Sequence, residues 1–117
     1  MSGKKFTRVI ALADFPNSGI ASIRSNGWHV VVARVGNAFH ALNDRCSHAA
    51  SPLSTGRLRH GVIICPLHGA RFDLASGKCI GNAYRAVRSF PVRMVDGWIE
   101  VALPSTPPDL AESPVMP

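Results

Sequence analysis

Two short segments set the architecture of this chain: Cys46-Ser47-His48 and, after a spacer of sixteen residues, Cys65-Pro66-Leu67-His68-Gly69. Each segment offers one thiolate and one imidazole. A thiolate is the soft ligand that sulfide-bridged iron prefers, and a neutral imidazole binds iron without adding negative charge. Cys46, His48, Cys65 and His68 are therefore the candidate ligands of one shared metal centre.

The spacer between the two segments has the pattern of a β-hairpin. It contains Arg57-Leu58-Arg59, the turn pair His60-Gly61 and the apolar run Val62-Ile63-Ile64. This pattern predicts two short strands joined by a tight turn at Gly61. Because a hairpin sends the chain out and back, we expect the two ligand segments to lie side by side.

The charge of the ligand set points to an iron-sulfur cluster with unequal irons. Two ferric ions, two bridging sulfides and two thiolates sum to zero when the remaining ligands are neutral imidazoles. Four thiolates would add two more negative charges. The smaller charge makes electron uptake easier, and potentials of such centres span about −150 to +300 mV, against roughly −400 mV for plant-type ferredoxins. We therefore expect a one-electron carrier of intermediate potential.

A structural zinc site is the alternative for the same four residues. Two Cys and two His bind Zn²⁺ tetrahedrally, and such a site would make the chain a zinc-stabilised interaction module. The two-loop spacing with Pro66-Leu67-His68-Gly69 favours the iron-sulfur cluster. Visible absorption and the EPR of the reduced protein distinguish the two sites, because zinc gives neither signal.

The stretch from Cys46 to Asp73 resembles the Rieske [2Fe-2S] family. The matching features are Cys-x-His, the sixteen-residue spacer, Cys-Pro-Leu-His-Gly and Arg71-Phe72-Asp73. The resemblance continues through residues 76–78 and 90–92 to about Leu103, so it covers most of the chain. It implies an all-β Rieske fold, with an antiparallel β-sandwich or barrel as the base and a small cluster-binding lobe.

The resemblance also implies a role for each ligand. One Rieske-type [2Fe-2S] cluster would be held with Cys46 and Cys65 on the inner iron. His48 and His68 would bind the outer iron near the surface. Electrons are then expected to enter and leave the cluster through its histidine edge.

Two departures from the respiratory members of the family indicate the type of Rieske protein. Those members carry an extra Cys in each loop, joined in a disulfide, where this chain has Ser51 and Leu67. They also place a Ser and a Tyr hydroxyl near the cluster, where this chain has Ala70 and Phe72. Hydrogen bonds to the cluster sulfurs raise the potential, so their absence predicts the low-potential, ferredoxin-like end of the range.

The length of the chain, 117 residues, corresponds to one domain. We therefore expect no mononuclear-iron domain of the kind that Rieske oxygenase large subunits require. His29, His40 and His60 do not form the two-His, one-carboxylate pattern of such an iron. We therefore expect an electron-transfer component of an oxygenase system and not an enzyme.

The resemblance implies two partners for such a carrier. A flavin-dependent ferredoxin reductase would supply single electrons, and a terminal oxygenase would receive them. The commonest setting is the ferredoxin component of bacterial multicomponent ring-hydroxylating dioxygenases, in which the carrier is a free monomer. The alternative is a small Rieske subunit fixed within a reductase complex such as nitrite reductase. Co-purification distinguishes the free carrier from the fixed subunit.

Composition bears on the compartment. The three cysteines, with no pattern for a disulfide framework, suggest a reducing environment. The first residues are too polar for a signal peptide, since Arg8 interrupts the apolar run. No apolar run approaches the length of about 20 residues that a membrane span needs. We expect a cytoplasmic protein that binds neither membrane nor nucleic acid.

The remaining sequence predicts short strands divided by turns. Asn26-Gly27, Gly36-Asn37 and Asp96-Gly97 are hairpin signals between apolar or β-branched runs. The predicted strands cover 6–12, 20–24, 28–35, 38–42, 87–95 and 98–103. We expect one Rieske domain over residues 1–103, with the cluster-binding lobe at about 45–75. Residues 104–117 contain five Pro, which predicts a disordered tail.

The basic side chains are confined to the predicted domain. Residues 1–103 carry thirteen Lys and Arg and five Asp and Glu, a net of +8, whereas the tail adds only Asp109 and Glu112. Several arginines lie close in sequence to the ligand segments: Arg45, Arg57, Arg59 and Arg71. Such a face would steer an acidic partner, and a solvated surface without a specific role is the alternative.

Overall fold

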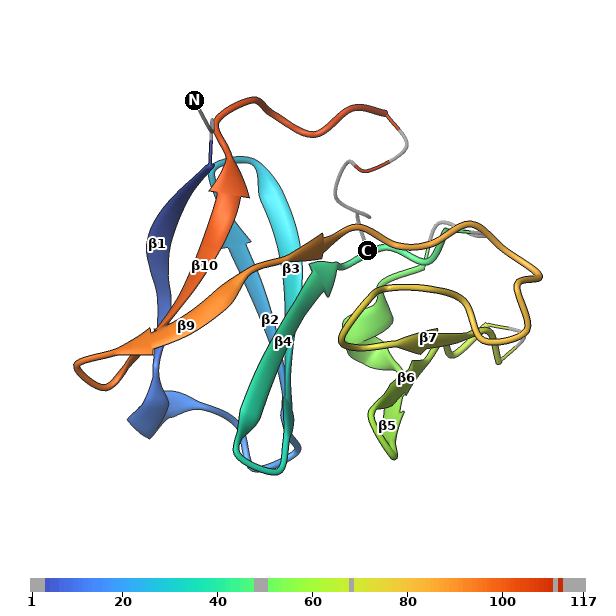
Figure 1. Cartoon of the computed structure of the whole chain (residues 1–117), viewed down its shortest axis with the longest axis horizontal. Helices are drawn as coiled ribbons and strands as arrows, with labels where there is room; N and C mark the ends of the chain where they lie inside the picture. The colour runs from blue at the N-terminus through green and yellow to red at the C-terminus, as the bar shows by residue number, and fades with distance from the viewer. Residues whose placement is uncertain (1–3, 48–50, 68, 111, 113–117) are drawn as a thin grey trace.

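A computed structural model of the chain describes residues 4–47, 51–67, 69–110 and 112, and it shows three antiparallel sheets (Figure 1). Two of the sheets pack into a base, and the third forms a separate lobe beside it. The all-β prediction is therefore confirmed, and so is its division into a sandwich base and a small lobe.

The base consists of a three-stranded and a four-stranded sheet. The first has the order β1-β10-β9, from β1 (Lys4–Ala11), β10 (Trp98–Pro104) and β9 (Val92–Val95). The second has the order β2-β3-β4-β8, from β2 (Ile20–Ser25), β3 (Trp28–Val35), β4 (Ala38–Asn43) and β8 (Ser89–Phe90). Apolar side chains of both sheets meet in the base core: Ala21, Trp28, Val30, Val32, Ala41, Phe90, Ile99, Val101 and Leu103.

The lobe is a three-stranded meander, and the second ligand segment lies between two of its strands. Its strands are β5 (Arg57–Arg59), β6 (Val62–Ile64) and β7 (Arg71–Asp73), in that order. The described residues contain two short 3-10 helices, η1 (Leu12–Asp14) and η2 (Leu53–Thr55). Within those residues, no helix has the length and apolarity to cross a membrane.

The predicted hairpins are confirmed, and three of them have one geometry. Each is a two-residue turn in which both central residues have positive φ: Asn26-Gly27, His60-Gly61 and Asp96-Gly97. Two positive φ angles define the type I′ turn, whose twist matches that of the flanking strands. The turn at 60–61 brings β5 and β6 together, as the hairpin prediction for the spacer requires.

The prediction of one strand over 87–95 is wrong, because Pro91 divides it. β8 pairs with β4 in one sheet, whereas β9 pairs with β10 in the other. Proline has no N–H to donate to a ladder, which favours a break at this residue. The Pro91 carbonyl instead accepts a hydrogen bond from the Ala102 N–H at 2.9 Å. The chain thus crosses from one base sheet to the other at a single residue.

Strand β3 is buried on both faces and joins the base to the lobe. Val30 and Val32 lie in the base core, whereas Val31 and Ala33 lie in the lobe core. Successive side chains of a strand point to opposite faces. The continuous apolar run in the sequence therefore serves two cores at once, which fixes the lobe against the base.

The described part of the tail makes contacts with the base. The indole Nε1–H of Trp28 donates to the Thr106 carbonyl at 3.0 Å, and Arg88 forms an ion pair with Glu112 at 2.6 Å. Residues 111 and 113–117 lie outside the described residues. The domain boundary at residue 103 and the disorder of the tail stay predictions.

Gly56→Ala tests the contact between η2 and β6. A Cβ at residue 56 would lie 2.0 Å from the Ile64 carbonyl oxygen, so the backbone would have to move. We expect the free energy of unfolding to fall by about 3 kcal/mol or more, measured by urea unfolding. Gly36→Ala is the matched control. Its Cβ would meet nothing within 4 Å, and its positive φ costs only about 1 kcal/mol. Equal losses in the two variants would contradict the steric account.

Candidate metal centre

Two loops of similar construction carry the candidate ligands. The Cys46 N–H donates to the Ser51 carbonyl at 2.9 Å, and the Cys65 N–H donates to the Ala70 carbonyl at 2.7 Å. In both loops the cysteine amide therefore bonds to the carbonyl five residues further on. Each cysteine stands at the base of a closed loop, and each predicted histidine falls inside the loop of its cysteine.

The elements around each loop hold its ends in place. The first loop follows β4 and precedes η2, and the second connects β6 to β7. The last pair of the β6–β7 ladder, Ile64 with Arg71, lies immediately outside the second loop. Inside that loop Gly69 has a φ of +70°, a backbone angle that glycine adopts without strain.

The thiols of both loops point into the same interior. Cys46 and Cys65 are 2% and 1% exposed, and both belong to the lobe core. The full set of buried residues in that core is Val31, Ala33, Leu42, Cys46, Leu53, Ile63, Cys65, Ala70, Phe72, Leu74, Cys79 and Val87. Two soft donors in an apolar, water-excluding interior suit the inner iron of a sulfide-bridged cluster.

The imidazoles of the predicted ligand set, His48 and His68, lie outside the described residues. Among the residues that are described, no group of three or more His, Cys, Asp and Glu could hold a metal ion. The structure thus places the two predicted cysteines in one core and leaves the assignment of all four ligands a prediction. Cys79 is a buried thiol of the same lobe core.

The segment after β7 packs along the first ligand loop. The Val87 N–H donates to the Gly77 carbonyl at 2.8 Å, and a Cβ on Gly77 would lie 2.0 Å from the Val87 carbonyl oxygen. The Ser47 hydroxyl donates to the Arg85 carbonyl, and the Asn43 N–H donates to the Arg88 carbonyl at 2.8 Å. Residues 85–88 are therefore held against the loop that begins at Cys46.

A buried polar cluster beside the first loop was missed by sequence reasoning. Asp44 is 1% exposed, and its carboxylate accepts the Ser54 N–H at 2.6 Å. The other carboxylate oxygen lies 3.2 Å from His29 Nε2, which is 2.6 Å from the Ser22 hydroxyl. Because Asp44 precedes the loop and Ser54 follows it, this carboxylate ties the two ends of the loop together. The only signal in the sequence was an acidic residue two positions before Cys46.

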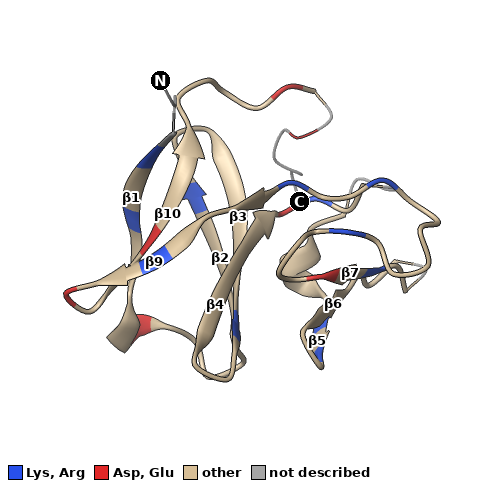
Figure 2. Ribbon diagram, viewed as in Figure 1, with Lys and Arg blue, Asp and Glu red and all other residues tan. Residues whose placement is uncertain are grey.

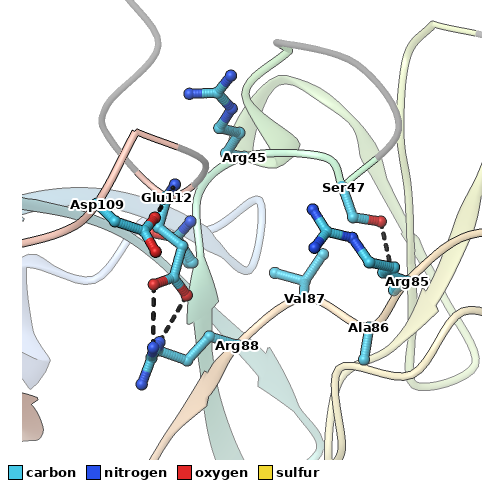
Figure 3. A pocket seen from close by; sticks show the side chains of 9 residues that line it. Arg45, Ser47, Arg85, Ala86, Val87, Arg88, Asp109 and Glu112 are labelled. Atoms are coloured by element: carbon cyan, nitrogen blue, oxygen red, sulfur yellow. Dashed lines mark hydrogen bonds and ion pairs between the residues drawn. The ribbon is translucent and has the colours of Figure 1, made fainter.

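The predicted basic face divides into two groups (Figure 2). The register of the lobe sheet puts Arg57, Arg59 and Arg71 on one exposed face, opposite the buried side chains of Ile63 and Phe72. Arg45 does not belong to this face. It lines a pocket of about 250 Å³ with Arg85 and Arg88, beside the first ligand loop (Figure 3).

Comparison with known proteins identifies the family of these loops. Residues 5–91 match the family described as Rieske [2Fe-2S] domain. The anthranilate 1,2-dioxygenase ferredoxin subunit of Burkholderia cepacia is 39% identical over 74 residues, which are 62% of this chain and 68% of that protein. The 3-phenylpropionate/cinnamic acid dioxygenase ferredoxin subunit of Escherichia coli is 37% identical over 81 residues, 68% of this chain and 76% of that protein.

Solved structures show the same architecture. The ferredoxin of carbazole 1,9a-dioxygenase from Nocardioides aromaticivorans superposes with a TM-score of 0.77 at 29% identity, covering 83% of this chain and 96% of that one. A chain from the complex of reduced oxygenase and oxidized ferredoxin in carbazole 1,9a-dioxygenase gives a TM-score of 0.75 at 31% identity, covering 83% and 92%.

Asp44→Ala tests whether the buried carboxylate supports the first ligand loop. The substitution leaves the Ser54 N–H without its acceptor and removes the carboxylate beside His29 in a buried site, so we expect a loss of about 3 kcal/mol in unfolding free energy. Asp44→Asn keeps an acceptor for Ser54 and should lose less. The exposed Asp14→Ala is the surface control, with a change within about 0.5 kcal/mol. If Asp44→Ala behaves like Asp14→Ala in thermal unfolding, the carboxylate does not hold the loop.

Proposed function

Because the chain belongs to the Rieske [2Fe-2S] domain family and carries its cluster, we propose that Cys46 and Cys65 bind the inner iron and that His48 and His68 bind the outer iron. Two observations support the cysteine half of this set. Both thiols are buried in one core, and each stands at the closed base of its loop. The histidine half rests on the position of each histidine within its loop. Membership of this iron-sulfur family argues against the alternative of a structural zinc site.

The protein is an electron-transfer component and not an enzyme, as its ferredoxin relatives are. We propose that it takes single electrons from a flavin-dependent reductase and passes them to a terminal oxygenase. The oxygenase half is supported by the similarity to a ferredoxin solved in complex with its oxygenase. We further propose that it works in the cytoplasm as a free monomer, since all three cysteines are buried thiols and carriers must exchange partners.

Stopped-flow reduction and oxidation test this function directly. The protein reduced by dithionite should show the EPR signal of a reduced [2Fe-2S] cluster and should transfer one electron to an oxidised ring-hydroxylating oxygenase. Sedimentation should show a monomer at micromolar concentration. A stable complex with a reductase would instead support the fixed subunit of a reductase such as nitrite reductase.

Cys46→Ser and Cys65→Ser test the ligand set. Each variant should lose the cluster, measured as iron and acid-labile sulfide per chain and as visible absorption, because the thiolates carry the negative charge that holds ferric iron. Cys79→Ala is the matched control, since Cys79 lies in the same core but outside both loops. Retention of a full cluster in either Ser variant would exclude that cysteine as a ligand.

Ala70→Ser with Phe72→Tyr tests the proposal of a low potential. Both residues are buried in the core that contains Cys46 and Cys65, so the new hydroxyls would lie in the surroundings of the cluster. A hydrogen bond that favours the reduced state by 1.4 kcal/mol raises a one-electron potential by about 59 mV. We expect voltammetry to show an upward shift of that order.

The half-buried Phe39 packs in the base against Phe15, and Phe39→Tyr should leave the potential unchanged. An unshifted potential in the Ala70→Ser/Phe72→Tyr variant would contradict the hydroxyl account. A decrease in potential would do the same.

A further inference from the structure

The described residues of the C-terminal segment follow a defined path across the protein. In Figure 1 the chain leaves β10 and arches over the top of the base. Trp28 Nε1–H donates to the Thr106 carbonyl at 3.0 Å, and Arg45 donates to the Leu110 carbonyl at 3.1 Å. Glu112 completes the path with two hydrogen bonds from Arg88, of 2.6 and 3.0 Å.

The segment ends at a surface of opposite charge. The pocket of about 250 Å³ described above is lined by Arg45, Arg85 and Arg88. We call this pocket the basic groove. Asp109 and Glu112 line the same pocket from the tail side (Figure 3). They are also the only acidic residues after position 103. Hydrogen bonding to the Glu112 carboxylate, together with the negative charges of Glu112 and Asp109, raises the pKa of Arg88 above its ordinary value.

The basic groove lies next to the candidate cluster site. Arg45 immediately precedes Cys46, and the Arg85 carbonyl accepts a hydrogen bond from Ser47 within the first ligand loop. Arg88 lies with its guanidinium 5.4 Å from the ring centroid of Trp28, so the base core supports one wall of the groove. A carboxylate bound here is therefore close to the loop that carries His48.

The contacts of the tail are of a kind that can be exchanged. The Arg88 side chain is 44% exposed, and exposed ion pairs contribute little stability and weaken with salt. A protein surface that presents carboxylates could make the same bidentate bonds to Arg88. The tail thus presents to the groove the same carboxylate groups that an acidic partner would present.

We propose that residues 104–110 together with Glu112 form a strap that covers the basic groove in the free protein, and that an acidic surface of the electron-transfer partner displaces this strap when it docks. The proposal rests on the proposed function, because it assumes that partners approach the cluster side. It assigns a role to a segment that the carrier function by itself does not require.

The Asp109→Asn/Glu112→Gln variant tests the strap by removing its charges. In the unaltered protein the backbone N–H of residue 112 donates to the Asp109 carboxylate at 3.0 Å. Asn at position 109 keeps an oxygen that can accept this hydrogen bond, so the local turn can persist. Asp14→Asn/Asp96→Asn is the matched control: it changes the net charge equally, at exposed positions outside the groove. Asn also tolerates the positive φ of residue 96.

The first measurement uses an anionic electron acceptor. The dithionite-reduced protein, freed of excess dithionite, is mixed with hexacyanoferrate(III), which takes one electron from the cluster and becomes hexacyanoferrate(II). We expect the second-order rate constant of the strap variant to exceed that of the control by about threefold or more at low ionic strength. The excess should vanish at high salt, because the attraction is screened.

The second measurement does not need the cluster. Binding of a fluorescein-labelled polyglutamate peptide is followed by anisotropy, and the strap variant should bind several-fold more tightly than the control. Adding Arg45→Gln and Arg88→Gln to the strap variant should abolish that gain. Equal rate constants and equal peptide affinities in the strap and control variants would overturn the strap proposal. Absence of the cluster's EPR signal in the unaltered protein would overturn the proposed function alone.

Discussion

The burial of one strand on both of its faces is the constraint on which this structure depends. β3 gives Val30 and Val32 to the base and Val31 and Ala33 to the lobe, so neither core can shift without the other. A rigid base is what a one-electron carrier needs, because the geometry of a buried cluster must survive repeated changes of charge. The two closed loops then fix the positions of the cysteines at their bases.

The sequence was most informative where the responsible physics is local. The turns at 26–27, 60–61 and 96–97 depend on two adjacent residues that accept positive φ, and they were predicted correctly. The apolar run of β3 was also visible, because four consecutive small or β-branched residues suit a strand buried on both faces. The division at Pro91 was missed because the flanking residues keep a strand-like composition on both sides of it. β7 was missed as a strand because three residues show no period.

Long-range features of the site were not predictable in the same way. Residue type and spacing were enough to predict Cys46 and Cys65 as candidate ligands. The role of Asp44 depends on its contacts with Ser54 and His29, which only the fold brings close to it. The same is true of Glu112, which meets Arg88 across 24 positions of sequence. Composition assigned the Pro-rich tail to disorder, since it lacks large apolar groups. It could not show that the few polar groups of the tail match a basic groove beside the first ligand loop.

The pairing of β1 with β10 has a consequence for the order in which the molecule can be assembled. Lys4 pairs with Pro104, so the first base sheet cannot close until residue 104 has been synthesised. The lobe has no such delay: its three strands are neighbours in sequence, and its core is complete once Val87 is available. Local contacts form before distant ones, and chains fold from the N-terminus during synthesis. The lobe core can therefore form before the pairing of β1 with β10 closes the first base sheet.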